Sequence, residues 1–309
     1  MNSIFNLDYE RLLKNCAACP RKCGVNRLKN ELGFCKAGKV AEVYSAHLHL
    51  GEEPPISGQN GSGTIFFAHC NLRCVYCQNY QLSQIENGKP FETDDLAGLM
   101  LSLQKEKAHN INLVTPTHYA PQIREAILLA HKGGLNIPIV YNTSGYEGIS
   151  TLQLLDGIVD VYLADMRYGD NKYALQYSTA PDYVEVNQAA VKEMHRQAGD
   201  LKLADNGIAV RGLIIRHLIL PHNISGTEEV LKFISRSLGE KTYISFMSQY
   251  YPAYNAFKHS GLSRRINKKE YDEALKLLDK YGLHKGWVQE YMGGSVDEGF
   301  AGTNIVLDV

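Results

Sequence analysis

The sequence predicts an α/β protein: a partial or complete β/α barrel with a small cysteine-rich segment before it. Short apolar strands alternate with helical patterns over most of the chain. A stretch rich in Gly, Pro and Ser, residues 51–63, precedes this alternation, and all seven cysteines lie before residue 78. We therefore expect a metal-binding N-terminal segment, residues 1–60, and a barrel domain, residues 61–309. A doubly wound open sheet is the alternative, because strand order cannot be read from the sequence.

The first elements belong to the N-terminal part. Residues 8–14 predict a short helix with Asp8 near its start. Residues 39–50 alternate apolar and polar side chains, which is typical of a half-buried strand. The strands expected after the linker are 64–68, 111–115, 137–142, 160–165, 208–219, 242–247 and 286–290.

Helical patterns lie between these strands, at 93–108, 120–132, 182–198, 226–238 and 267–281. The first begins Thr93-Asp94-Asp95, which suits an N-cap and an acidic first turn. The second has Pro121 near its first helical position. About six or seven strand–helix units in about 240 residues are typical of a parallel barrel with its helices outside.

The composition is that of an ordinary globular protein, with 44% apolar and 21% charged residues. The net charge of −1 gives no reason to expect a nucleic acid or an anionic membrane as partner. The sequence contains no run of 18 apolar residues, so no membrane-spanning helix is predicted. The first residues lack the pattern of a secretory signal, so we expect a cytoplasmic protein.

A loop with three cysteines follows the first predicted barrel strand. Its spacing, Cys70-x3-Cys74-x2-Cys77, lets three thiolates turn toward one point. A four-iron cluster is normally held by four cysteines, so three would leave one iron open to another ligand. The competing interpretation is a zinc loop, which would need a fourth ligand such as His69.

The other four cysteines form a compact set of their own, Cys16-x2-Cys19-x3-Cys23-x11-Cys35. Four thiolates suit either tetrahedral zinc or a second iron–sulfur cluster. Nearby lysines and arginines would lower the pKa of these thiols. The segment is too small to bury a core alone, so a metal would supply its folding energy.

Polar or aromatic residues follow each further strand, where the architecture places active sites. These exits are 115–119 (TPTHY), 142–146 (NTSGY), 164–168 (ADMRY), 216–222 (RHLILPH) and 247–252 (MSQYYP).

The cysteine motif after a first strand resembles the radical S-adenosylmethionine (radical SAM) superfamily. Over roughly residues 60–290 the chain looks most similar to proteins related to pyruvate formate-lyase activating enzyme, in an uncharacterised branch with an N-terminal cysteine cluster. The resemblance implies that Cys70, Cys74 and Cys77 hold a [4Fe-4S] cluster whose open iron binds the amino and carboxylate groups of SAM. One electron then cleaves SAM to methionine and a 5′-deoxyadenosyl radical, which removes hydrogen from a substrate.

The resemblance also implies roles for residues near SAM. Tyr76 matches an aromatic residue that packs near adenine. Thr115-Pro116-Thr117-His118 replaces the family's Gly-Gly-Glu-Pro-like loop, so the Thr117 hydroxyl or backbone carbonyls would receive the SAM amino group. His118 is either a substrate-side residue or a hydrogen-bonded loop histidine.

Further residues at the later strand exits match the same family. Asn142 and Thr143 resemble the start of its Asp-Thr-Asn-Gly loop, and Asp165 with Arg167 resembles its Asp-x-Lys exit; together these loops would form a monovalent cation site. Arg167 and Arg216 would approach the SAM carboxylate. Gln249 would approach the ribose or methionine part.

By resemblance, we expect an enzyme that draws electrons from a donor such as flavodoxin or ferredoxin. Its substrate would be a glycine in a partner glycyl-radical protein. The alternatives are radical modification of a peptide, a cofactor precursor or RNA. A non-catalytic, metal-stabilised binding protein is a further alternative.

Overall fold

One mixed sheet organises the computed structural model, which describes residues 10–85, 88–291 and 304–306. Its strand order is β11-β10-β9-β8-β6-β5-β4-β2-β1-β3, with β7 beside β8. Every strand from β2 to β10 along this path is parallel to its neighbour. Their order follows the chain without reversal, which confirms the barrel and excludes the doubly wound alternative. Among the described strands the sheet ends at β11 and β3, so the barrel is partial.

The strands are β1 Ala41–His49, β2 Ser62–Phe67, β3 Lys89–Phe91, β4 Ile111–Val114, β5 Ile139–Thr143, β6 Val161–Asp165, β7 Lys202–Leu203, β8 Ala209–Leu218, β9 Tyr243–Met247, β10 Gly286–Gln289 and β11 Asn304–Val306. The α-helices are α2 Pro54–Ser57, α3 Thr93–Lys105, α4 Ala120–Lys132, α5 Ile149–Leu154, α6 Asn171–Ser178, α7 Tyr183–Ala198, α8 Thr227–Ser237 and α9 Lys268–Lys280. The described part of the predicted first helix, residues 10–14, is helical.

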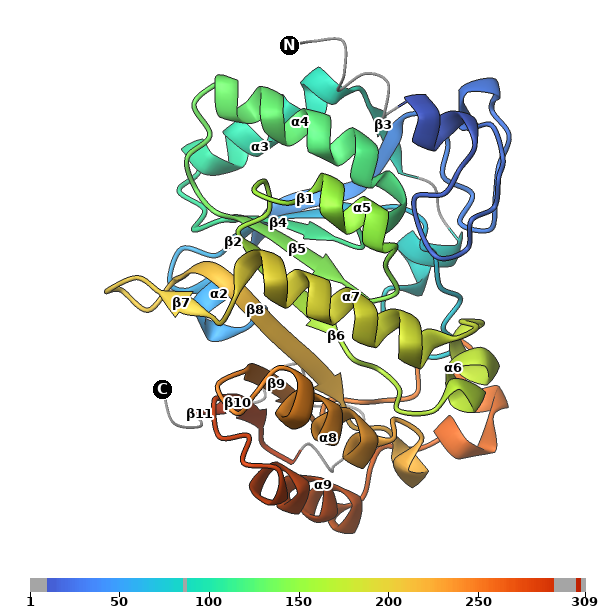
Figure 1. Ribbon diagram of the computed structural model, residues 1–309, viewed down its shortest axis with the longest axis vertical. Helices are drawn as coiled ribbons and strands as arrows, with labels where there is room; N and C mark the ends of the chain where they lie inside the picture. Colours follow the sequence, from blue (N-terminus) through green and yellow to red (C-terminus); the bar gives the residue numbers. More distant parts are fainter. Residues whose placement is uncertain (1–9, 86–87, 292–303, 307–309) are drawn as a thin grey trace.

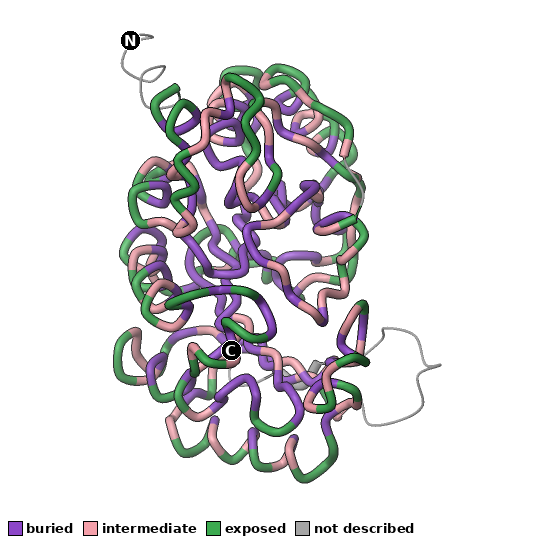
Figure 2. Tube along the Cα trace, turned by 90° about the vertical axis from the view of Figure 1, so that its right-hand side faces the viewer, coloured by how far each residue is buried: buried purple, intermediate pink, exposed green. Residues whose placement is uncertain are grey.

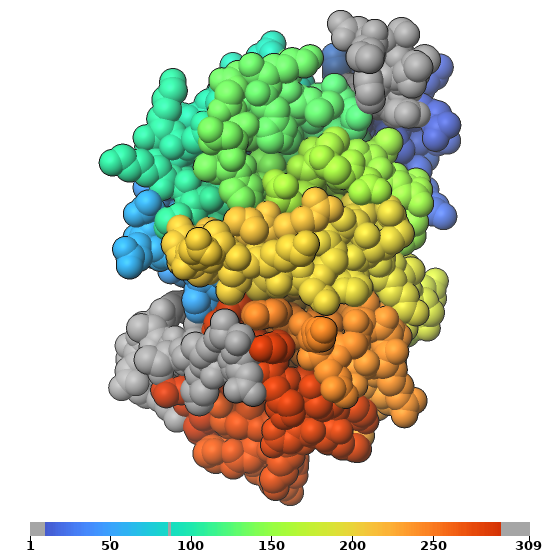
Figure 3. Space-filling view, turned by 60° about the vertical axis from the view of Figure 1, so that its left-hand side comes forward, coloured from blue at the N-terminus to red at the C-terminus, as the bar shows by residue number. Residues whose placement is uncertain are grey.

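Helices connect the parallel strands and cover the outside of the sheet (Figure 1). Strands β4, β5 and β6 are buried at every residue, because helices cover one face and the barrel interior the other. From green through yellow to red the colours run in chain order along the long axis, and blue segments of the N-terminal part lie beside this series (Figure 3). The core follows this sheet through the centre of the molecule (Figure 2).

Local sequence explains where several helices begin. Asn267 and Glu270 form a capping box at α9, which satisfies two backbone donors. Asp94 and Asp95 lie in the first turn of α3 as predicted, although Thr93 is the first helical residue and Glu92 precedes it. In the described residues no helix is long and apolar enough to cross a bilayer.

The N-terminal part joins the sheet instead of standing apart. The predicted ribbon is β1, which pairs antiparallel with β2 and β3. Arg27 donates hydrogen bonds to the carbonyl oxygens of Gly38 (2.8 Å) and His118 (2.7 Å), which ties the cysteine-rich segment to the start of α4. The boundary near residue 60 stays a prediction.

Candidate active site

The three-cysteine loop leaves the carboxyl end of β2 and is anchored by its neighbours. Asn71 is fully buried, and its side chain donates to the carbonyl oxygen of Tyr146 at 2.7 Å. The backbone amides of Arg73 and Val75 donate to carbonyl oxygens at the end of α6, at 3.0 and 2.8 Å. The loop is therefore held between the α6 end and the loop after β5.

Each thiol in this loop has a hydrogen-bond partner. The Cys70 sulfur accepts from the Leu72 amide (3.3 Å), and the Cys77 sulfur lies 3.3 Å from the Ser83 hydroxyl. The Cys74 sulfur accepts from the Ser178 hydroxyl at 3.0 Å and from Arg167 Nη1 at 3.3 Å. Donors of this kind stabilise sulfur that carries negative charge.

Burial controls the ionisation of these thiols. It raises the pKa of Cys70 to about 12 and that of Cys77 to about 11. Both remain protonated at neutral pH unless a metal centre takes the thiolate and releases the proton. Cluster loading is thus coupled to proton release.

A network of opposite charges lies beside the loop. Arg216 on β8 donates to Asp165 Oδ1 at 2.7 Å and to Asn142 Oδ1 at 2.6 Å. Arg167 contacts the other Asp165 oxygen at 2.6 Å. Burial alone would raise the pKa of Asp165, but Arg216 and Arg167 hold it below its ordinary value. Asp165 is therefore an ionised carboxylate that fixes both guanidinium groups.

Two glutamates that the sequence analysis did not identify complete the network. Glu52 accepts from Asn112 at 3.0 Å and lies 3.5 Å from Arg216 Nη1. Glu53 is 6% exposed, and its Oε2 has no hydrogen-bond partner among the described residues. Burial raises the pKa of both carboxyls, and the Arg216 charge opposes that effect.

A cavity of about 250 Å³ connects the cysteine loop with this network. Its lining includes Glu52, Tyr76, Cys77, Asp165, Arg167, Arg216 and Gln249. The fold thus brings five of the predicted SAM-site residues to one cavity beside a cysteine. Asn142 is not among the residues that line the cavity, but its side chain hydrogen-bonds to Arg216 and Glu52, which are.

The remaining predicted residues lie elsewhere. The hydroxyls of Thr117 (2.5 Å) and Thr143 donate to Glu147, which is 2% exposed. Burial raises the pKa of Glu147 to about 7, although these hydrogen bonds stabilise its carboxylate. His118 is 1% exposed, lines the four-cysteine cavity and contacts the Ala68 carbonyl oxygen at 2.8 Å.

What these residues bind stays a prediction. The hydrogen bonds of Thr117 and Thr143 to Glu147 neither support nor contradict a role in SAM binding. The same holds for the monovalent cation near Asn142 and Asp165. The oxygens available there already accept hydrogen bonds from the two arginines.

The four N-terminal cysteines line one cavity on the flank of the molecule, in the blue segment of Figure 1. Cys16, Cys19 and Cys35 are buried and Cys23 is exposed. The expected lowering of the thiol pKa is wrong for Cys19 and Cys35. Burial raises the pKa of both and outweighs the charge of Arg27, which favours the Cys35 thiolate.

Signals for the missed residues were present but weak. Glu52 and Glu53 are adjacent acids in a linker otherwise made of Gly, Pro, Ser and other uncharged residues. Asn112 is a single polar side chain in the apolar strand β4, and it is fully buried. A buried polar side chain needs a partner, which would have pointed to the barrel interior.

Comparison with known proteins adds a family and a relative. Residues 56–178 match the family described as a 4Fe-4S single cluster domain. The protein called "Uncharacterized protein MJ0674" from Methanocaldococcus jannaschii is 33% identical over 284 residues, which is 89% of this chain and 77% of that protein.

Solved structures with similar folds are much more distant in sequence. TYW1 with a lysine-pyruvate adduct bound is 13% identical, with a TM-score of 0.45 over 73% of this chain and 75% of that one. The structure titled native anSMEcpe with bound AdoMet is also 13% identical, with a TM-score of 0.48 over 69% of this chain and 58% of that one.

Proposed function

We propose that this chain, which belongs to the radical SAM superfamily, binds SAM in the cavity beside Cys77 and cleaves it reductively. The observation that carries the proposal is the placement of Arg167. One guanidinium contacts both the Cys74 sulfur and Asp165, and it lines the cavity. When bound, a [4Fe-4S] cluster and SAM supply the electron and the carbon–sulfur bond whose cleavage gives the 5′-deoxyadenosyl radical.

The protein's part in this chemistry is to bind and orient. Arg167 and Arg216 present two guanidinium groups to the cavity, and Asp165 holds them in place through three hydrogen bonds of 3.0 Å or less. Guanidinium groups bind carboxylates through paired hydrogen bonds. These two arginines are the groups that would receive the SAM carboxylate.

Glu52 also lines this cavity, and its carboxyl group lies 3.5 Å from Arg216 Nη1. The chain lacks the family's Gly-Gly-Glu-Pro-like loop after the second barrel strand. The Thr117 hydroxyl, which could replace it, already donates a hydrogen bond to Glu147. We propose that Glu52 receives the SAM amino group in place of that loop. Its pKa is raised by burial, and a cationic ligand would favour the ionised form.

The test is reconstitution of the protein with iron and sulfide without oxygen, followed by dithionite and SAM. The expected products are 5′-deoxyadenosine and methionine in equal amounts. Absence of both from protein that carries the loop cluster would refute the proposal and favour a non-catalytic binding protein.

For the substrate, we propose a glycine backbone in a partner glycyl-radical protein, with flavodoxin or ferredoxin as electron donor. The support is the resemblance of the exits at Asn142 and Asp165 to those of activating enzymes. Incubation with reduced donor, SAM and a glycyl-radical protein should give a glycyl radical signal with one 5′-deoxyadenosine per radical. Deoxyadenosine without that radical would favour the alternative substrates: a peptide, a cofactor precursor or RNA.

A further inference from the structure

The cavity between the four N-terminal cysteines is wider than a single metal ion requires. Cys16, Cys19, Cys23 and Cys35 all line it, and its volume is about 10 Å³. That is about the space of one water-sized sphere. Sulfur atoms about 2.3 Å from a zinc ion leave no such space between them. The cavity that the four cysteines line therefore has more room than one zinc ion needs.

The three-cysteine loop provides an internal reference for this spacing. It lies within residues 56–178, which match a 4Fe-4S family. In the parts of the chain that the structure describes, neither cysteine set forms a group of three or more ligands that could hold a metal ion. In a four-iron cluster each cysteine binds a different iron, so its thiolates do not converge on one ion. Among the described residues neither cysteine set converges on a single ion, which agrees with cluster ligands and not with zinc ligands.

Two buried polar groups at the four-cysteine cavity are incompletely paired, although Arg27 donates to the carbonyl oxygens of Gly38 and His118. Arg27 is 1% exposed and lines the cavity, yet within the described ranges it forms no ion pair. His118 lines it as well, and its buried Nδ1 has no hydrogen-bond partner there. A buried cation without an anionic partner is costly. A thiolate-ligated cluster is anionic and would compensate the Arg27 charge.

We propose that Cys16, Cys19, Cys23 and Cys35 hold a second [4Fe-4S] cluster. Four thiolates coordinate all four irons, so this cluster has no open iron and does not bind SAM. The proposal does not depend on the function proposed for the three-cysteine loop.

The second cluster would lie directly against the first cysteine loop, because two arginines connect the segments reciprocally. Arg21, between Cys19 and Cys23, donates to the Asn71 carbonyl oxygen at 3.0 Å. Arg73, next to Cys74, donates to the Phe34 carbonyl oxygen at 3.0 Å. The Arg21 guanidinium also lies 3.6 Å from the centre of the Phe34 ring.

The experiment compares metal content in three proteins reconstituted without oxygen: the wild type, a Cys70→Ala/Cys74→Ala/Cys77→Ala variant, and a variant with all four N-terminal cysteines changed to Ala. We expect about eight irons and eight sulfides per wild-type chain and about four of each in the triple variant. About one zinc per chain in the triple variant, or no metal, would overturn the proposal.

A second measurement uses only the wild type, in case a variant fails to fold. Electron paramagnetic resonance of the reduced protein should show two cluster signals, of which SAM alters one. A single signal that SAM alters completely would contradict a second cluster. Failure of the proposed function has a different outcome, in which the triple variant keeps its iron while the wild type makes no 5′-deoxyadenosine.

Discussion

The two cysteine sets differ in what lies beside their thiols. The loop of Cys70, Cys74 and Cys77 borders a cavity of about 250 Å³, with Arg167 and Arg216 in its wall. The four N-terminal cysteines enclose about 10 Å³ next to one buried arginine, Arg27. Three cysteines would leave one iron of a cluster without a thiolate ligand. The cavity beside them and its two arginines would give SAM the space and the charges that it needs to bind there. Four thiolates in a closed space give a site that binds only its own metal centre.

The largest expected effect separates the two sets directly. Cys74→Ala should reduce 5′-deoxyadenosine formation to background, because the loop would lose a proposed cluster ligand that also contacts Arg167 and Ser178. Cys19→Ala should leave measurable product in the same assay. The comparison fails if Cys74→Ala retains full activity or if Cys19→Ala alone abolishes the product in protein that still holds its loop cluster.

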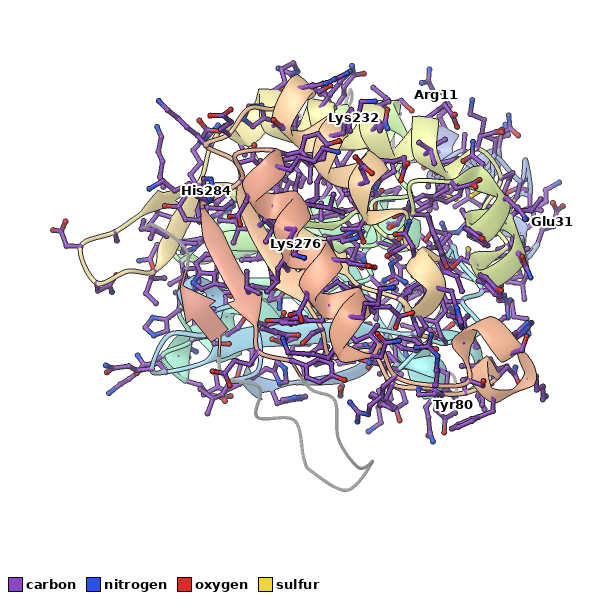
Figure 4. The ribbon with its side chains drawn as sticks, turned by 90° about the horizontal axis from the view of Figure 1, so that it is seen from below. Arg11, Glu31, Tyr80, Lys232, Lys276 and His284 are labelled. Carbon is purple, nitrogen blue, oxygen red and sulfur yellow. The ribbon has the colours of Figure 1, made fainter. Side chains whose placement is uncertain are left out.

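Arg216→Ala should lower the free energy of unfolding by about 3 kcal/mol, because Glu52 loses its ion-pair partner and Asp165 keeps only Arg167. Denaturant unfolding measures this effect. Arg216→Lys should recover part of it, whereas the exposed Arg11→Ala, at the outer edge of Figure 4, should change little. Equal free energies of unfolding for Arg216→Ala and Arg11→Ala would show that the charge network around Arg216 does not stabilise the fold.

Glu147 lies between the two cysteine sets. The carbonyl oxygen of the adjacent Tyr146 accepts a hydrogen bond from Asn71 in the three-cysteine loop, and the Glu147 carboxyl group lies near Cys19. Its carboxyl pKa is raised by burial from 4.5 to about 7. Between these values the folded state keeps a proton on Glu147 that the unfolded state has lost, so the contribution of Glu147 to stability falls as pH rises through this window. The loss is about 3 kcal/mol. Burial lowers the pKa of His118 to about 3 and that of His217 to about 4, so these two histidines contribute in the opposite direction.

Urea unfolding of the wild type and of Glu147→Gln at several pH values checks this prediction. Relative to the wild type, Glu147→Gln should gain about 3 kcal/mol of unfolding free energy from pH 4.5 to pH 7, because the falling contribution of Glu147 is removed. The exposed Glu106→Gln is the control and should keep the slope. An unchanged slope in Glu147→Gln would assign the pH dependence to other groups.

Glu52→Gln should weaken SAM binding about 10-fold, which is about 1.4 kcal/mol, because the amide cannot offset a cationic ligand. Equilibrium binding to the protein with its loop cluster measures the change. The same substitution should leave the metal content of the four-cysteine site unaltered. Wild-type affinity in Glu52→Gln would remove this residue from the SAM site.

The smallest effect concerns the contacts between the two regions. Arg21→Ala and Arg73→Ala each remove a charged hydrogen bond to a backbone carbonyl and should cost about 1 kcal/mol. Thermal unfolding with Arg11→Ala as the matched control measures it. Additive losses in the double variant would mean that the two arginines act independently of each other.

The sequence was sufficient for the parallel strands, because each is a short apolar run between a loop and a helix. It did not predict α6, although Asp170 caps it by accepting from the Lys172 amide at 2.7 Å. That helix ends at Ser178, which contacts Cys74. Such a contact between residues far apart in the chain depends on the fold, which a linear pattern does not contain.

The site shows the same limit. Asp165, Arg167 and Arg216 lie at or near the carboxyl ends of parallel strands, so their meeting at one edge could be predicted. Glu52 comes from before the first barrel strand and reaches the same cavity only because α2 and the residues before it turn back into the barrel. Thr117 follows β4 and Thr143 ends β5, yet the hydroxyls of both donate to Glu147.

The most direct test of the account is the magnetic coupling between the reduced cluster and SAM that carries an isotopically labelled amino nitrogen. We predict coupling in the wild type and in the variant that lacks the four N-terminal cysteines, and none in the variant without Cys70, Cys74 and Cys77. Coupling that survives in the latter variant, or is absent from the wild type with its loop cluster, would contradict an open iron at the three-cysteine loop.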